Sequence, residues 1–130
     1  MFRRIVEPGA VAAAASLDLT DVQRAVLTTA YDAVTRASGS AAHRQADSRF
    51  PLAFASITGS PSIIDAVTRV QATLHDMLLQ IPVYDVNIAH SHRQHEHILR
   101  AVLDGRPDNA RQTMEEHCDD TAALLRGLLG

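Results

Sequence analysis

The sequence predicts an all-α protein, an antiparallel bundle of about six helices that forms a single domain over residues 1–130. Hydrophobic residues make up 46% of the chain and aromatic residues only 4%, which favours helices packed on helices over a β-sandwich. Apolar residues recur at helical spacing along the chain, and no stretch has the pattern of a strand. A chain of 130 residues suits one compact domain, and it contains no internal repeat or interdomain linker.

Two helices are predicted in the first third of the chain. The first covers about residues 2–15, with a kink or a restart expected near Pro8. The second lies within residues 16–40 and ends at the sequence "SGS". Thr20 is placed as its N-cap, and Gln23, three residues later, completes a capping box.

Proline and glycine mark the boundaries of the later helices. The third helix is predicted over about residues 41–57, and Ser60 and Pro61 then provide the N-cap and first position of the fourth. Three further boundaries follow: a break around Pro82, the end of a fifth helix at Gly105, and the start of a last helix at Pro107 that runs to about residue 128.

Charge and composition exclude several functions. A net charge of −3 argues against direct binding of this chain to nucleic acid, because such binding depends on cationic contacts to phosphate. No apolar run approaches the roughly 20 residues that span a bilayer, and Glu7 and Pro8 interrupt the apolar centre that a signal peptide would need. The lone Cys118 rules out an internal disulfide and fits a reducing compartment. We therefore expect a cytoplasmic protein that does not contact membranes.

Four of the seven histidines fall within "AHSHRQHEHILRAVLDG", residues 89–105. Projected at about 100° per residue, His95 falls in the centre of the apolar stripe of its helix and His92 near the edge. His90 and His97 fall on the opposite, solvated side. The stripe itself consists of Ile88, Ile98, Leu99, Val102 and Leu103. The four histidines therefore do not form one site, and only His95 is predicted to point inward.

Two more polar groups share apolar helix faces. His117 lies on the face of the last helix that carries Met114, and Asp47 lies on the face of the third helix that carries Phe50. A buried carboxylate needs a cationic partner, which Arg44, His43 or a metal ion could provide. One carboxylate with two imidazoles is an ordinary ligand set for zinc and other divalent transition metals, although inward histidines are also found simply hydrogen-bonded in cores.

One amide also faces inward in the predicted bundle. Gln71 lies on the inward stripe of the fourth helix, where it is either a hydrogen-bonded core amide or a contact to a ligand. The sequence contains no serine or cysteine in a recognisable nucleophile frame, and no general base can be identified beside the candidate ligands. We therefore expect no enzymatic activity, with metal-assisted hydrolysis on a three-ligand site as the competing possibility.

Four stretches in order resemble a known family. They are "RIVEPGAVAAAA" from Arg4, "DSRFPLAFASITGSP" from Asp47, "QHEHILRAVLDGRPDNA" from Gln94 and "TMEEHCDD" from Thr113. Together they resemble the effector-binding C-terminal (FCD) domain of GntR-type transcription regulators of the FadR-like subfamily. The resemblance implies a helical sensor that binds a small carboxylic acid and forms a homodimer. It also implies that DNA is contacted only through an N-terminal winged helix-turn-helix, which the chain, opening directly on the sensor's first helix, is expected to lack.

The same resemblance implies a metal-ligand set. In the metal-binding branch of this family the ligands correspond to Asp47, residue 51, His95 and His117, and residue 51 is proline here. Three outcomes stay open: a divalent metal such as zinc or nickel on the remaining three residues, a substitute imidazole from His43 or His92, or an organic anion bound without metal. The alternatives to a sensor are a stand-alone helical metal-binding protein and a structural dimerisation module with a degenerate site.

Overall fold

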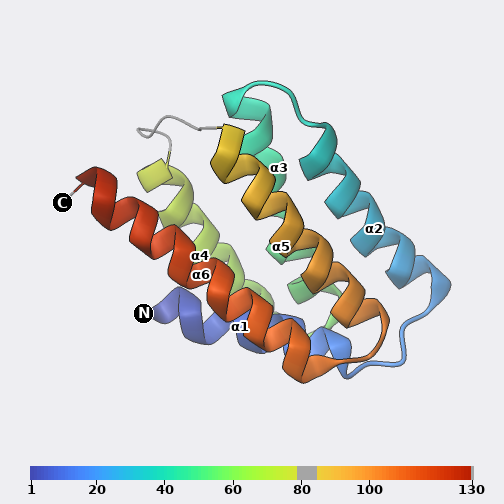
Figure 1. Cartoon of the computed structure of the whole chain (residues 1–130). Helices are drawn as coiled ribbons and strands as arrows, with labels where there is room; N and C mark the ends of the chain where they lie inside the picture. The colour runs from blue at the N-terminus through green and yellow to red at the C-terminus, as the bar shows by residue number, and fades with distance from the viewer. Residues whose placement is uncertain (79–84, 130) are drawn as a thin grey trace.

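The computed structural model describes residues 1–78 and 85–129, with the backbone alone for residues 85–87, 128 and 129. These residues form six α-helices and no strand (Figure 1), as the sequence predicts. The helices are α1 (Phe2–Ala15), α2 (Asp21–Arg36), α3 (Ser40–Ile57), α4 (Pro61–Leu78), α5 (Asp85–Leu103) and α6 (Pro107–Leu129). The break expected around Pro82 and the side chain of Leu128 lie outside the described residues.

The helix ends follow the predicted capping residues. Thr20 Oγ1 accepts from the Gln23 amide at 3.1 Å, and the Gln23 side chain accepts from the Thr20 amide at 2.9 Å, which completes the capping box. Ser60 Oγ accepts from the amide of Ile63 at 3.3 Å at the start of α4. Gly105 has a φ of +68°, which glycine adopts without strain, and it ends α5 as predicted.

α1 is the central element of the bundle. It packs against α3, α4, α5 and α6 and crosses behind the lower half of α6 in Figure 1. Its small side chains allow this close packing, and its buried apolar residues are Ala10, Val11, Ala12, Ala14 and Ala15. Instead of restarting at Pro8, the helix runs continuously from Phe2 to Ala15.

Two pairs of helices face each other without direct backbone packing in the described residues. α3 packs on α1, α2 and α4 but not on α5, and α4 packs on α1 and α3 but not on α6. Side chains such as Phe50, Phe54 and Ile98, all fully buried, fill the interior between α3 and α5. The interior between α3 and α5 is where the predicted site residues lie, while the space between α4 and α6 is a cavity described below.

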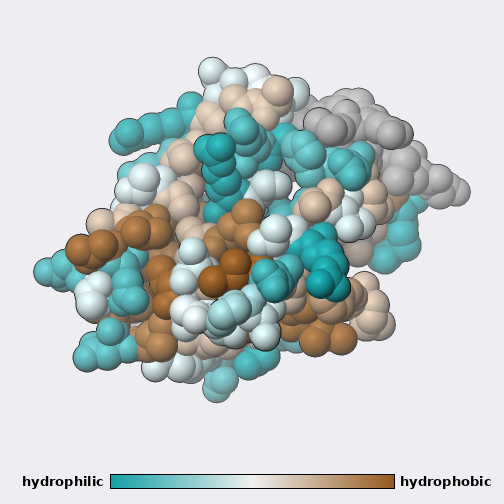
Figure 2. Space-filling view, turned by 180° about the vertical axis from the view of Figure 1, so that it is seen from behind, coloured by the Kyte–Doolittle hydropathy of each residue, from teal (hydrophilic) through white to brown (hydrophobic). Residues whose placement is uncertain are grey.

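The outer surface carries apolar residues in several places. No helix in the described part of the chain is both long and apolar enough to cross a membrane. Figure 2 shows several separate hydrophobic areas among hydrophilic ones on the face seen from behind. The most exposed large apolar side chains after Met1 are Val22 (74%) and Ile5 (67%), on α2 and α1. The predicted homodimer is not tested by these features and stays a prediction.

Candidate functional site

His95 and Asp47 meet in the interior between α5 and α3. His95 is 2% exposed, and its Nε2 atom lies 3.6 Å from Oδ1 of Asp47, too far for a hydrogen bond. The ring of Phe50 lies 4.4 Å from the imidazole, centroid to centroid, and covers one side of it. Burial lowers the pKa of His95 to about 4, although the nearby Asp47 charge opposes the shift. At neutral pH His95 is therefore uncharged and does not form an ion pair with Asp47.

His117 on α6 lies beside His95, with ring centroids 4.8 Å apart. Burial and the proximity of His95 lower the pKa of His117 well below its usual value, so it is also neutral. Its Nδ1 atom lies 2.6 Å from Oε1 of Gln94, an acceptor, so Nδ1 carries the proton of the ring. The Nε2 atom of His117 consequently keeps its lone pair, as a metal ligand requires.

A chain of polar contacts links this imidazole to the surface. The Gln94 amide nitrogen donates to Oδ2 of Asp120 at 2.8 Å, and the same oxygen lies 2.8 Å from Nε2 of His90. Because a carboxylate only accepts, the amide of Gln94 must present its oxygen to His117. His90 and His97 are exposed, as predicted from the helix projection.

His43 and His92 form a second pair of imidazoles at the neighbouring end of the site. Their ring centroids are 5.7 Å apart, and burial together with His43 lowers the pKa of His92. His43 precedes Asp47 by one helical turn on α3, and His92 precedes His95 by three residues on α5. Both residues considered as substitute ligands therefore lie on the same side of the site as Asp47 and His95.

The site has buried polar atoms without a hydrogen-bond partner. Among the described residues these include Asp47 Oδ1, His92 Nε2 and His95 Nδ1. Neither Arg44 nor His43 forms the ion pair with Asp47 that the sequence left open, and the Arg44 Nη1 atom is itself buried without a partner. Unpaired buried groups of this kind are expensive, and a bound cation would compensate the carboxylate.

The donor atoms at the site are of the kinds that divalent transition metals prefer, but the side chains are not arranged around a common point. Asp47, His95 and His117 offer one carboxylate and two neutral imidazoles. In the described part of the chain, no three His, Cys, Asp or Glu side chains are already arranged to hold an ion. Pro51 is buried in α3, at the position where the family resemblance implies a fourth ligand, and offers no donor. Holding a metal would therefore require these side chains to rotate toward each other.

A buried polar network on α1 was not predicted from the sequence. Arg3 Nε donates to Oε1 of the fully buried Glu7, and Gln71 donates to Oε2 of Glu7 at 2.6 Å. Gln71 is therefore a core amide, which was the first of its two predicted roles. Arg3 Nη1 is buried without a partner, and the charge of Arg3 contributes to the lowered pKa of both His95 and His117.

Helix periodicity contained a signal for these missed residues. Glu7 shares its helix face with Val11 and Ala14, a spacing that indicates a buried carboxylate, and Arg3 precedes it by one turn. Gln94 precedes Ile98 by one turn on the buried stripe of α5.

Comparison with known families identifies the chain. The model of the FCD domain matches residues 1–120, so the chain belongs to the FCD domain family. FCD domains are the effector-binding C-terminal domains of GntR-family regulators, a regulatory rather than a typically catalytic class. The resemblance drawn from four short stretches is thus confirmed. No curated protein matches the chain.

Proposed function

We propose that this domain senses a small organic acid at a centre formed by Asp47, His95 and His117, and that it does so through a divalent transition metal such as zinc or nickel. The observation that supports the proposal most is the meeting of one carboxylate and two imidazoles from three helices in the interior. Asp47 Oδ1 is buried there without a hydrogen-bond partner, as expected for a metal ligand without its ion.

The protonation states favour metal binding. Burial keeps both imidazoles neutral, so no proton has to be displaced before they coordinate at neutral pH. Gln94 holds His117 in the tautomer that leaves Nε2 free. A divalent ion on these residues would supply the positive charge that attracts an acid, and the neighbouring Arg3 adds a second cationic group.

Because Pro51 occupies the position of the fourth ligand that the family resemblance implies, the proposal takes two forms. In the first, the three residues hold the metal alone, and water or the carboxylate of the effector completes the coordination. In the second, His92 or His43 replaces the missing imidazole, and the buried Nε2 atom of His92, which has no hydrogen-bond partner, supports this variant. In both variants the effector binds without turnover, in a cytoplasmic homodimer whose DNA contacts belong to a separate winged helix-turn-helix domain.

Elemental analysis and calorimetry test the proposal. The purified chain, stripped with a chelator, is titrated with Zn²⁺ and Ni²⁺ and then with lactate, malate and citrate. Asp47→Asn and His117→Gln should abolish metal uptake, whereas His97→Gln, an exposed histidine on the same helix as His95, should bind like the wild type. Equal metal affinity in all variants would exclude this centre. Recovery of the acids unchanged by NMR separates sensing from catalysis.

A further inference from the structure

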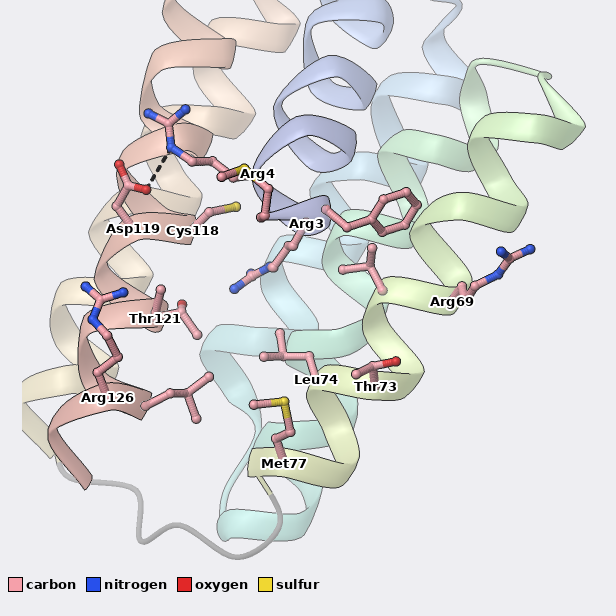
Figure 3. A pocket seen from close by; sticks show the side chains of 15 residues that line it. Arg3, Arg4, Arg69, Thr73, Leu74, Met77, Cys118, Asp119, Thr121 and Arg126 are labelled. Atoms are coloured by element: carbon pink, nitrogen blue, oxygen red, sulfur yellow. Dashed lines mark hydrogen bonds and ion pairs between the residues drawn. The ribbon is translucent and has the colours of Figure 1, made fainter. Parts of the chain in front are cut away.

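A cavity separates α4 from α6 at the end of the domain where α1 begins. It has a volume of about 540 Å³, within the range of pockets that hold small molecules. Figure 3 shows Arg3 extending from α1 into the space between the two helices, with Cys118 beside it on α6 and Leu74 and Met77 on α4. The cavity lies outside the cluster of Asp47, His95 and His117.

The two long walls of this cavity are mainly hydrocarbon. α4 contributes Val70, Leu74 and Met77, and α6 contributes Ala122 and Leu125. The side chain of Met77 lines the cavity and is 41% exposed to solvent. Val70 and Leu74 are only 7% and 9% exposed, so Met77 provides most of the apolar surface that α4 exposes to this cavity. An apolar ligand body would remove this surface from water, which is favourable.

Arg3 stands at the inner end of the cavity. Arg4, Arg69 and Arg126 also line the cavity, and Arg4 is paired with the carboxylate of Asp119 at 2.8 Å. In Figure 3 Arg69 and Arg126 stand at the two sides with their guanidinium groups turned outward, whereas Arg3 points inward. Glu7 takes only the Nε side of Arg3, and Nη1 is buried without a partner. One donor therefore remains for an anion at this end.

We infer that this cavity is a second ligand site of the domain and binds an amphipathic monocarboxylate, whose carboxylate is held by Arg3 and whose apolar body lies between α4 and α6. The inference goes beyond the proposed function, because this site does not include the metal centre. A hydrophilic acid such as citrate would satisfy Arg3 but leave both walls exposed to water. A neutral alcohol would cover the walls, and its hydroxyl oxygen could accept from Nη1, but it lacks the negative charge that makes a guanidinium–carboxylate hydrogen bond stronger than a neutral one. A molecule with both a carboxylate and an apolar body therefore fits the cavity best.

Chain-length dependence of binding provides the first test. Two samples of the protein, one loaded with metal and one treated with chelator, are each titrated by calorimetry. The ligands are butanoate, hexanoate, octanoate and decanoate, with octanol and citrate for comparison. Affinity should rise about fourfold for each added methylene until the walls are filled, and octanoate should bind more tightly than octanol. Affinity that does not change with chain length, or equal binding of octanoate and octanol, would overturn the inference.

Matched variants separate the two ends of the cavity. Met77→Glu places a charge on the apolar wall and should weaken octanoate binding about tenfold or more, while Val26→Glu, a substitution at a similarly exposed position on α2 (43% against 41%), should not. Arg3→Lys keeps a cation beside Glu7 but removes Nη1, and should also weaken octanoate binding, unlike Arg4→Lys. Unchanged octanoate binding in both Met77→Glu and Arg3→Lys would overturn the inference.

The outcomes also distinguish this inference from the proposed function. If metal binds at Asp47 and citrate binds through it, but octanoate does not bind, the inferred second site is wrong and the sensor proposal stands. If octanoate binds with the expected dependence on chain length, and Asp47→Asn changes neither metal uptake nor octanoate affinity, the cavity is supported and the metal centre is excluded.

Discussion

Gln94 fixes the tautomer of His117, because its carbonyl oxygen lies 2.6 Å from the Nδ1 atom of that imidazole. The orientation of the amide is set in turn by Asp120, which accepts from its nitrogen at 2.8 Å. A neutral imidazole with its proton on Nδ1 has its lone pair on Nε2. The exposed carboxylate of Asp120 thus determines, through one amide, which nitrogen of a buried histidine is available to a ligand.

Gln94→Ala should weaken metal binding without removing any proposed ligand. His117 would lose the partner that orients it, and outer partners of this kind typically contribute about tenfold to 100-fold in metal affinity. Competition with a chromophoric chelator measures the change. Gln112→Ala, at an exposed glutamine on the same helix as His117, serves as control. Equal metal affinity of the Gln94 and Gln112 variants would show that the contact does not position His117 for metal binding.

Pro51→His should strengthen metal binding by supplying the imidazole that the family resemblance places at this position. The substitution also restores a backbone N–H that can donate to the carbonyl of Asp47 one turn earlier. Pro51→Ala restores the N–H without the imidazole, so the comparison isolates the side chain. We expect the histidine variant to bind Zn²⁺ more than about tenfold more tightly than the alanine variant. Similar affinities would mean that position 51 does not face the ion.

Periodicity predicted the inward direction of the site residues well. His95 and His117 are buried, and the helix projection also separated them from the exposed His90 and His97. This succeeded because helix geometry alone determines which face a side chain shares with its apolar neighbours. The proximity of Asp47 to His95 and of His95 to His117, by contrast, depends on which helices are neighbours, which the helix projection does not determine.

Helix periodicity could not predict the contacts among Arg3, Glu7 and Gln71, or the cavity between α4 and α6. The apolar face that Glu7 shares with Val11 indicates that Glu7 is buried, but the sequence does not show that Gln71 of another helix donates to its carboxylate. The cavity exists because α1 holds α4 and α6 apart, and a separation between helices has no signature in either helix. Such features depend on three-dimensional packing.

Glu7→Gln should strongly destabilise the fold. Glu7 is fully buried and contacts both Arg3 and Gln71, so its neutralisation leaves the Arg3 cation without its partner. Removing one member of a buried pair typically costs about 3–5 kcal/mol of unfolding free energy. Urea denaturation measures the loss. Glu115→Gln removes a carboxylate that faces the exposed Arg4 and should change stability little. Similar losses in the two variants would show that burial does not strengthen the Arg3 pair.

The metal-free domain should lose stability as the pH falls below about 6.5. Burial holds the pKa of His95 at about 4, against 6.5 when it is exposed, so the unfolded chain binds more protons between these values. Stability therefore rises with pH through this window and is retained above it, and His117 contributes in the same direction. From about pH 7 to about pH 5, His95 alone should account for a loss of about 2 kcal/mol.

Urea midpoints measured with chelator present test this dependence. His95→Gln cannot take up the proton, so its stability should fall less between these two pH values than that of the wild type, whatever its stability at neutral pH. His97→Gln removes an exposed histidine from the same helix and should keep the wild-type dependence. Bound Zn²⁺ should shift the loss to lower pH, because protons and metal compete for the same nitrogen atoms. An identical pH dependence in His95→Gln and the wild type would contradict the neutral, buried state of this imidazole.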